Sequence, residues 1–168
     1  MMTRSDTYDR FAESAGEYGV ELTRTTAESL PGTIESVITT PVVGAPLPWD
    51  DCSLPEPVPT DPSPAELDAA VTGVSAASLA VADYGSVVLE ATPGGGEPVS
   101  LFPDEHVVVL REDDIVPDME TAFEWLDEQF RDTGGSAIVA TGPSATADMG
   151  SLVKGAHGPK EVHAVVVT

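Results

Sequence analysis

The sequence predicts an α/β fold in which helices flank a mainly parallel sheet. Short apolar, β-branched runs such as 106–110 and 162–167 have no consistently polar face, as expected for strands covered on both sides. Segments with helical periodicity alternate with these runs. The chain has 168 residues, 41% of them hydrophobic, which is enough for one core. A single domain is therefore expected over 1–168.

The first elements alternate between helix and strand. A helix is expected over 5–19, because apolar residues recur at helical spacing and two glycines end the segment. A short strand is expected over 20–26. Ser29 is expected to cap a helix over 29–38, and a second strand is expected over 41–45.

Proline, aspartate and serine dominate residues 46–64, a composition typical of an exposed connection between two halves of a domain. Ser63 and Glu66 then form the Ser-x-x-Glu pattern of a capping box, with Pro64 at the first helical position. A helix is therefore expected to begin at Pro64 and to continue into 67–71.

Strands dominate the next part of the chain. Residues 78–84 and 86–91 are expected to form a hairpin or a bent pair, because only a short turn at Tyr84-Gly85 divides them. Three consecutive glycines within 92–98 lack the spacing of nucleotide-binding loops. That stretch is expected to be a mobile flap or a tight turn.

The clearest helical pattern lies within 117–135, which carries acids in its first turn and glycines at its end. Its expected buried stripe is Met119, Ala122, Phe123, Leu126 and Phe130. A strand is expected at 136–140, followed by a turn, and the last strand is expected at 162–167.

Charge excludes one class of partner. The chain has 29 acidic and 7 basic residues, a net charge of −22, which repels the phosphate backbone of nucleic acids. Its hydrophobic content is too high for a disordered acidic protein. The acids are spread along the whole chain, as expected for a surface that works in concentrated salt, where the screening length falls to about 3 Å at 1 M. A halophilic cytoplasm is therefore expected.

Cys52 is the only cysteine. One thiol forms no internal disulfide and does not supply the several thiolates of a zinc or iron–sulfur site, so no cofactor is expected on this chain. No apolar run approaches the roughly 18–20 residues that cross a bilayer, and residues 1–11 lack an apolar signal core. A cytoplasmic protein is expected.

The first candidate site is the stretch "TGPSATADMG" at 141–150. It is expected to leave the carboxyl end of a buried strand and to enter a helix, where open α/β sheets bind ligands. Its N–H groups and hydroxyls suit an anionic or carbonyl oxygen; they belong to Thr141, Gly142, Ser144, Ala145 and Thr146, with Pro143 stiffening the loop. Asp148 offers an acceptor or a base. Helix capping without any ligand explains the same residues, and the sequence leaves both interpretations open.

The second candidate site is "GAHGPKEVH", where His157 lies among glycines. A histidine in such a loop can donate to a ligand or move a proton near neutral pH. His163 falls inside a strand pattern and is interpreted as a packing or surface residue. No recognised ligand spacing links these histidines with Asp148, so no metal site is predicted.

The third candidate site is the turn "VADYGSVVLEA", with Asp83, Gly85, Ser86 and Glu90. A plain turn at Tyr84-Gly85 and a solvated strand residue at Glu90 explain it equally simply. Further along, Ser100 precedes a second turn and His106 is expected to open a strand.

Four motifs of this chain together resemble those of a known protein family. "VADYGSVVLEA", "SLFPDEHVVVL", "TGPSATAD" and "GAHGPKEVHAVVV" resemble the successive motifs of the lactate utilisation protein C family, the LUD domain, over roughly residues 75–168. The resemblance implies a fold like that of the ribose-phosphate isomerase and CoA-transferase superfamily. It also implies a role in oxidising L-lactate to pyruvate with iron–sulfur partner subunits, while this chain carries no cluster. With the acidic composition, it suggests a halophilic archaeon as the source.

Two departures from the family pattern concern the candidate sites. The family commonly has Ala-Glu-Thr-Gly-Thr where this chain has Ala82-Asp83-Tyr84-Gly85-Ser86, and Asp-Ile-Glu where this chain has Asp148-Met149-Gly150. The bulky Tyr84 and the missing carboxylate at Gly150 leave the catalytic role unassigned among Asp148, His157 and Asp83. The expected ligand-binding residues are Gly85, Ser86, Thr141, Gly142, Pro143, Ser144, Thr146, Asp148, His157 and Gly158.

Three functions remain open from the sequence. The leading one is an accessory subunit of a lactate-oxidising iron–sulfur system, whose cleft holds a small carboxylate, another anionic ligand, a cofactor or a partner segment. The second is an autonomous transferase, ligase or isomerase acting on a CoA, folate or sugar-phosphate substrate, with Asp148, Asp83, Glu90 or His157 as acid or base. The third is a purely structural interaction protein. The first two require that the Gly-Pro-Ser and His-Gly-Pro bends meet at one pocket.

Overall fold

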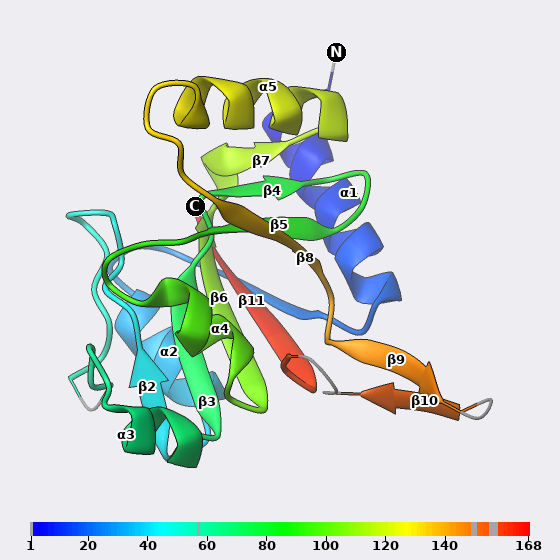
Figure 1. Ribbon diagram of the computed structural model, residues 1–168. Coiled ribbons are helices and arrows are strands. Elements are labelled where there is room, and N and C mark those ends of the chain that lie inside the picture. Colours follow the sequence, from blue (N-terminus) through cyan, green and yellow to red (C-terminus); the bar gives the residue numbers. More distant parts are fainter. Residues whose placement is uncertain (1, 57, 149–150, 155–157) are drawn as a thin grey trace.

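The structure, a computed structural model, describes residues 2–56, 58–148, 151–154 and 158–168, with the backbone alone over 145–148 and 151–154. Two sheets form its centre, and helices lie around them (Figure 1).

The larger sheet has five strands, and every neighbouring pair in it is parallel. Its order is β1 (Glu21–Thr25), β11 (Glu161–Val167), β6 (Glu105–Arg111), β3 (Thr72–Ala76) and β2 (Val42–Gly44). The α/β class and the mainly parallel sheet predicted from the sequence are confirmed.

The sequence pattern missed β3, although it is the strand between β2 and β6. Its residues Gly73 and Ser75 are small or polar and give no β-strand signal, although Ser75 is fully buried, as is Thr72. The preceding helix α3 (Pro64–Ala69) ends sooner than expected. Its predicted start is confirmed, because Ser63 Oγ accepts a hydrogen bond from the Glu66 N–H at 3.2 Å.

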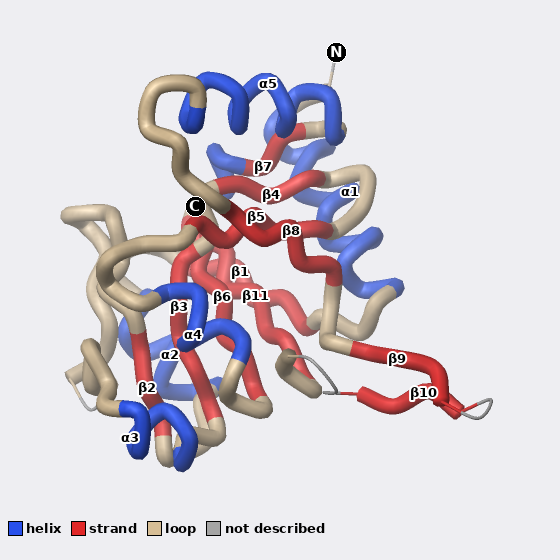
Figure 2. The backbone as a smooth tube through the Cα atoms, viewed as in Figure 1, coloured by secondary structure: helices blue, strands red, loops and turns tan. Residues whose placement is uncertain are grey.

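A second sheet of four strands faces the parallel sheet (Figure 2). Its order is β7 (Ile115–Val116), β4 (Leu79–Val81), β5 (Ser86–Glu90) and β8 (Ala137–Thr141). The expected hairpin is confirmed, because β4 and β5 pair antiparallel. β8 pairs antiparallel with β5 at the sheet edge. It is not the buried strand that we expected, since Val139 is 44% exposed.

Four further helices cover the sheets. They are α1 (Arg4–Glu17), α2 (Leu30–Val37), α4 (Gly96–Leu101) and α5 (Met119–Phe130), and a 3-10 turn spans Glu112–Asp114. The helices expected within 5–19, 29–38 and 117–135 are confirmed. The tight turn expected in the glycine-rich stretch is present, since the Gly95 N–H donates to the Thr92 carbonyl oxygen at 3.1 Å, and this turn leads directly into α4.

Two helix details differ from expectation. Ser29 makes no side-chain cap hydrogen bond at the start of α2. In α5 the buried position is Ala122, while Phe123 is 62% exposed and Trp125 packs toward the sheet in its place. Helical spacing alone did not distinguish these two neighbouring aromatic positions.

The core follows the alternation of β6. Val107 and Val109 point to the face where α2 packs with Leu30. Val108 and Leu110 point to the opposite face, where the second sheet packs. Residues on both faces are therefore buried, which explains the continuous apolar run in the sequence.

The connection 46–64 was expected to be exposed, and this expectation is wrong in part. Cys52 and Val58 are buried and belong to the core on the α2 face. Burial raises the pKa of the Cys52 thiol. Asp51 anchors the segment by accepting a hydrogen bond from Arg111 Nη1 at 2.8 Å. A proline-rich segment without helices can still bury isolated side chains.

The turn after β8 does not enter a helix. It leads to an antiparallel hairpin of β9 (Ala145–Asp148) and β10 (Ser151–Lys154) that extends away from the two sheets (Figure 1). The anion cradle expected at a helix N-terminus is therefore wrong. Small residues such as Ala145, which favoured a capped helix, do not distinguish a helix start from an exposed hairpin.

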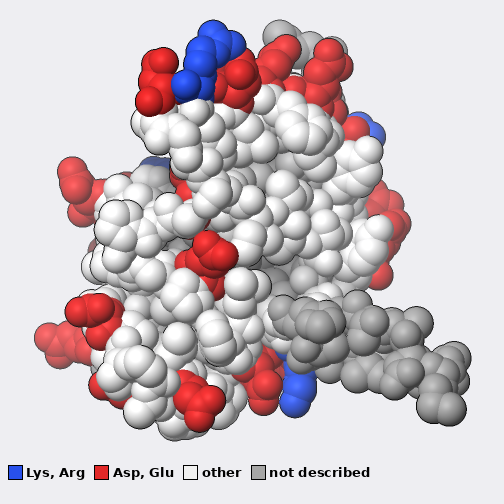
Figure 3. All heavy atoms as spheres, viewed as in Figure 1, with Lys and Arg blue, Asp and Glu red and all other residues white. Residues whose placement is uncertain are grey.

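Acidic side chains lie mainly around the outline of the face shown in Figure 3, and basic side chains there are few. None of the helices in the described part of the chain is long and apolar enough to cross a membrane.

Candidate functional site

The Gly-Pro-Ser and His-Gly-Pro bends lie next to each other in the structure. The Ser144 N–H donates a hydrogen bond to the Pro159 carbonyl oxygen at 2.8 Å. A Cβ atom placed on Gly158 would lie 3.2 Å from Ser144 Cβ. The two bends therefore form one wall, and they border a pocket of about 370 Å³, called the amino-edge pocket below.

The amino-edge pocket lies between the two sheets. Its lining residues are Val20, Gly85, Val87, Leu89, Ser100, Leu101, His106, Ala140, Thr141, Gly142, Pro143, Ser144, Gly158, Pro159 and Val162. His106 and Val162 are the second residues of β6 and β11. The turn leaves the carboxyl end of β8 as expected, but the pocket lies at the amino ends of the parallel strands and not at their carboxyl ends. The reason is that β8 belongs to the second sheet.

The described lining is largely apolar and contains no lysine or arginine. Val87 and Leu89 come from β5, Ala140 comes from β8, and Val162 comes from the parallel sheet. These side chains suit the apolar body of a ligand or of a partner segment. The polar side chains of the lining are those of Ser100, His106, Thr141 and Ser144.

His106 is a buried polar residue of this pocket, with 4% of its surface exposed. Its Nε2 lies 2.8 Å from Ser75 Oγ, and Ser75 Oγ lies 2.7 Å from Ser100 Oγ. Ser100 Oγ donates onward to the Gly96 carbonyl oxygen at 2.6 Å. Burial lowers the pKa of His106 to about 4, so the ring is neutral at pH 7.

Gly73 permits this hydrogen-bonded chain. A Cβ atom at Gly73 would lie 2.0 Å from the Val99 carbonyl oxygen. With glycine there, α4 lies directly against β3, which brings Ser100 of the helix onto Ser75 of the strand. The close contact between the backbones of α4 and β3 thus positions Ser100 beside Ser75.

Two glycines that were predicted to bind a ligand line the pocket, and close packing explains why both positions are glycine. Gly85 has φ +65° and a Cβ atom there would lie 2.3 Å from the Ala15 backbone nitrogen. Gly142 has φ +66° and a Cβ atom there would lie 2.7 Å from Tyr18 Cβ. Both positions exclude a side chain, so close packing alone accounts for the glycines.

The predicted hydroxyls of Ser86 and Thr141 bond to each other. The two residues are paired across β5 and β8, and their oxygens lie 2.6 Å apart. Ser86 is buried and is not among the lining residues, whereas Thr141 borders the pocket. Pro143 borders the pocket too, and the Ser144 N–H joins the two bends by its hydrogen bond to the Pro159 carbonyl oxygen.

The predicted acids do not gather at this pocket. Asp83 forms an ion pair with Arg10 at 2.6 Å and is not a lining residue. Thr146 and Asp148 lie in β9, and the structure describes their backbone only. His157 and Gly150 fall outside the described residues, so their predicted roles remain predictions. Tyr84 is 52% exposed.

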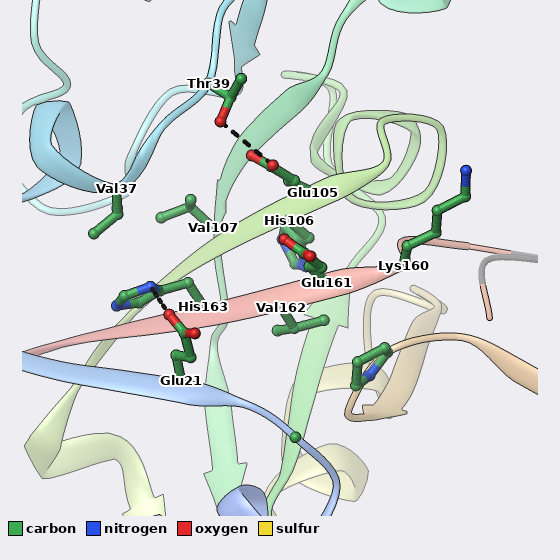
Figure 4. A pocket seen from close by; sticks show the side chains of 12 residues that line it. Glu21, Val37, Thr39, Glu105, His106, Val107, Lys160, Glu161, Val162 and His163 are labelled. Carbon is green, nitrogen blue, oxygen red and sulfur yellow. Dashed lines mark hydrogen bonds and ion pairs between the residues drawn. The ribbon is translucent and has the colours of Figure 1, made fainter.

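A smaller pocket of about 260 Å³ adjoins the amino-edge pocket and shares His106, Pro143 and Val162 with it (Figure 4). It is rich in charge, with Glu21, Glu161 and Lys160 among its lining residues. His163 also lies here, with Nε2 2.7 Å from Thr23 Oγ1 and Nδ1 3.5 Å from a Glu21 oxygen. Burial lowers the pKa of His163, and the Glu21 carboxylate opposes that shift.

A third pocket, of about 360 Å³, lies at the carboxyl ends of β2 and β3 and is called the carboxyl-edge pocket below. Glu90 and Thr92 line it together with Gly96. Ser78 Oγ donates to a Glu90 carboxylate oxygen. Glu90, considered above as an acid or base, is therefore at the opposite edge from the two bends.

The sequence interpretation missed the polar chain itself. It treated His106 as a strand opening, noted Ser100 without a role and did not consider Ser75. One signal was present: a histidine followed by four apolar residues at the start of a buried strand needs a hydrogen-bond partner. The residues described by the structure contain no cluster of potential metal ligands.

Comparisons with known proteins give a consistent result. A Lactate utilization protein C from Deinococcus radiodurans is 29% identical over 99% of this chain and 82% of that protein. Proteins of the same name from Bacillus velezensis and a Geobacillus species are 36% and 34% identical, over 56% and 57% of this chain. Those alignments cover 41% and 42% of the relatives, so the matched part is less than half of their length.

A solved structure has a similar fold. It is the crystal structure of a DUF162 family protein from Deinococcus radiodurans, with a TM-score of 0.73, 24% identity and full coverage of both chains. The LUD domain matches residues 64–167, which include β3 to β11 and therefore most of the amino-edge pocket. The chain belongs to the LUD domain family.

Proposed function

We propose that this protein is an accessory subunit of an L-lactate-oxidising system whose iron–sulfur clusters are carried by partner subunits. One observation carries the proposal: the alignment with a protein named Lactate utilization protein C extends over 99% of this chain. The chain itself has one cysteine, which is buried, whereas an iron–sulfur cluster commonly takes four thiolates. The redox centres of the system would therefore belong to its partners.

The amino-edge pocket is the proposed binding site of this subunit. Its described lining is largely apolar, includes a neutral histidine, and contains no lysine or arginine. A free carboxylate placed there would lose its hydration without gaining a positive partner from those residues. The described lining therefore favours an uncharged ligand, or an apolar segment of a partner, over the small anion considered from the sequence.

The alternative is an autonomous transferase, ligase or isomerase. Such an enzyme needs an acid or base aimed into the pocket. Asp83 is engaged with Arg10, and Glu90 lies at the carboxyl-edge pocket. The described carboxylates therefore favour the accessory role, and turnover by the purified protein alone would support the alternative.

The experiment is a deletion of the gene in its own organism, followed by growth on L-lactate as the sole carbon source. We expect growth on L-lactate to fail, growth on pyruvate to continue, and the plasmid-borne gene to restore growth. An affinity-tagged copy from lactate-grown cells should copurify cysteine-rich iron–sulfur proteins. Normal growth of the deletion strain on L-lactate would overturn the proposal.

A further inference from the structure

We infer that His106 Nδ1 is the hydrogen-bond acceptor for the hydroxyl group of an uncharged ligand in the amino-edge pocket. Ser75 and Ser100 are positioning residues that hold the ring with Nδ1 unprotonated. This inference deepens the proposed function, because it rests on that pocket being the ligand site.

The order of donors along the polar chain determines the tautomer. Ser100 Oγ lies 2.6 Å from the Gly96 carbonyl oxygen, which only accepts, so the Ser100 proton is used there. Ser100 must then accept from Ser75, whose oxygen is 2.7 Å away. Ser75 has one hydroxyl proton, and it is donated to Ser100. The 2.8 Å contact between Ser75 Oγ and His106 Nε2 therefore requires that Nε2 carry the proton and donate it to Ser75. A neutral ring protonated at Nε2 has a lone pair at Nδ1.

The Nδ1 atom is open to the pocket. Its ring belongs to the side of β6 that faces the second sheet, the same side as Val108 and Leu110, because alternate strand residues share a face. The ring borders the amino-edge pocket and also the adjoining charged pocket, and the face that it shares with Val108 and Leu110 is the one toward the amino-edge pocket. Among the described residues, Asp83 Oδ1 is the one side-chain nitrogen or oxygen atom that is buried from solvent and has no hydrogen bond, and it is ion-paired. Nδ1 is therefore not sealed, and no described group bonds to it.

The surroundings define the ligand class. An unpaired acceptor in an apolar pocket favours a donor from the ligand, because a polar group left there without a partner loses the hydrogen bond that water would give it. A hydroxyl supplies that donor without a charge. Val87, Leu89 and Val162 suit an apolar group attached to the same ligand. The ligand is thus a small uncharged molecule, or an uncharged end of a larger one, with a hydroxyl next to an apolar group.

The protonation state suits binding more than proton removal. Burial lowers the pKa of His106 to about 4, so the ring stays neutral at pH 7 and is a weak base. The neighbouring charged groups at the same edge are Glu105, Glu161 and Lys160, and none of them bonds to the ring. The role assigned to His106 is therefore recognition of a hydroxyl.

The first test measures the tautomer directly. Nitrogen NMR of the protein with ¹⁵N-labelled histidine distinguishes a protonated ring nitrogen from an unprotonated one. We expect His106 to be protonated at Nε2 in the unmodified protein. Ser100→Ala frees the Ser75 proton to point at Nε2, so the Nδ1-protonated form should increase. Ser78→Ala, a matched change at the carboxyl-edge pocket, should leave the His106 signals unchanged. An Nδ1-protonated ring in the unmodified protein overturns the inference.

The second test uses three probes of similar size: L-lactamide, propionamide and L-lactate. Propionamide lacks only the hydroxyl of L-lactamide, and L-lactate carries a charge in place of the amide. We expect L-lactamide to shift the His106 Nδ1 signal and propionamide to leave it in place. L-lactate should bind more weakly than L-lactamide, since the described lining has no lysine or arginine.

The variant His106→Gln keeps a donor for Ser75 and removes the Nδ1 acceptor. It should weaken L-lactamide binding about five- to tenfold, the effect of one lost hydrogen bond, while propionamide binding stays unchanged. The inference is overturned by an equal Nδ1 shift with propionamide, by no shift with L-lactamide, by tighter binding of L-lactate, or by full L-lactamide affinity in a folded His106→Gln variant. Should that variant fail to fold, the tautomer and probe titrations of the unmodified protein still decide. Normal lactate growth of the deletion strain would overturn the proposed function and leave these results intact.

Discussion

The two ends of the parallel sheet differ in how they are built. At the carboxyl edge, part of the pocket beside Glu90 and Thr92 is formed by residues at and directly after the ends of β2 and β3, where α/β sheets usually bind ligands, and the rest by the end of β5 and the segment after it. At the amino edge, the pocket is completed by the turn after β8 and the bend before β11. In this protein the residues that resemble family motifs gather mainly at the amino edge.

The difference follows from the second sheet. β8 pairs antiparallel with β5 and carries the chain from the second sheet to the start of β11 (Figure 1). A strand that belongs to another sheet can end beside the amino ends of the parallel strands. The carboxyl-end rule therefore applies to the parallel strands themselves and not to β8.

The largest effect on stability is expected from a glycine-to-alanine substitution, made in one variant at the amino edge and in another variant at the carboxyl edge. Gly73→Ala places a Cβ atom 2.0 Å from the Val99 carbonyl oxygen, so α4 must move from β3, and unfolding should become easier by about 4 kcal/mol or the protein should not fold. Gly96→Ala meets only ordinary contacts, the nearest at 3.5 Å, and should change stability by less than about 0.5 kcal/mol. Urea unfolding measures both variants. Similar stabilities would show that the close contact of α4 with β3 is not required.

The next effect is on function. Ala140→Phe should fill the amino-edge pocket from β8 and abolish complementation of the deletion strain on L-lactate. Thr92→Phe places the same side chain in the carboxyl-edge pocket and should leave growth unchanged. Thermal unfolding of both variants controls for loss of fold. The reverse pattern of growth would transfer the functional site to the carboxyl edge.

The same comparison explains what was predictable from sequence. Apolar runs such as 106–110 predicted β6 correctly, because a strand buried on both faces has a composition of its own. The turn at 141–144 was recognised as a candidate, and its neighbour at 158–159 was expected beside it. These predictions needed only local pattern and family resemblance.

Other features needed tertiary information. β3 is built from small residues whose burial depends on α4, and Gly73 has meaning only beside Val99. The hydrogen-bonded chain joins residues that are 25 and 31 positions apart, so no local spacing reveals it. The edge position of β8 is likewise a property of strand pairing, which the sequence of that strand does not encode.

A smaller effect concerns pH. Burial lowers the pKa of His106 from 6.5 to about 4, so between these values the unfolded chain binds the proton and the folded protein does not. The contribution of the neutral His106 ring to the free energy of unfolding is therefore fully present above pH 6.5. It falls by about 3 kcal/mol as the pH decreases to 4. His106→Gln should remove that part of the decrease, while the carboxylates contribute equally to both proteins. Parallel stability curves for the two proteins between pH 4 and 6.5 would contradict a neutral buried ring at the amino edge.

The smallest expected effect concerns charge at the amino edge. Glu161 and Glu105 are paired positions on the neighbouring strands β11 and β6, so two like charges face each other at the start of the sheet. Glu161→Gln should raise stability by a few tenths of a kcal/mol in dilute buffer, because like charges on paired strand positions repel. The gain should disappear in 1 M KCl, where the screening length is about 3 Å. The unmodified protein, with its net charge of −22, should also unfold at a higher temperature in KCl, as a protein adapted to salt would. An equal gain from Glu161→Gln in both buffers would show that repulsion between these carboxylates does not limit stability at this edge.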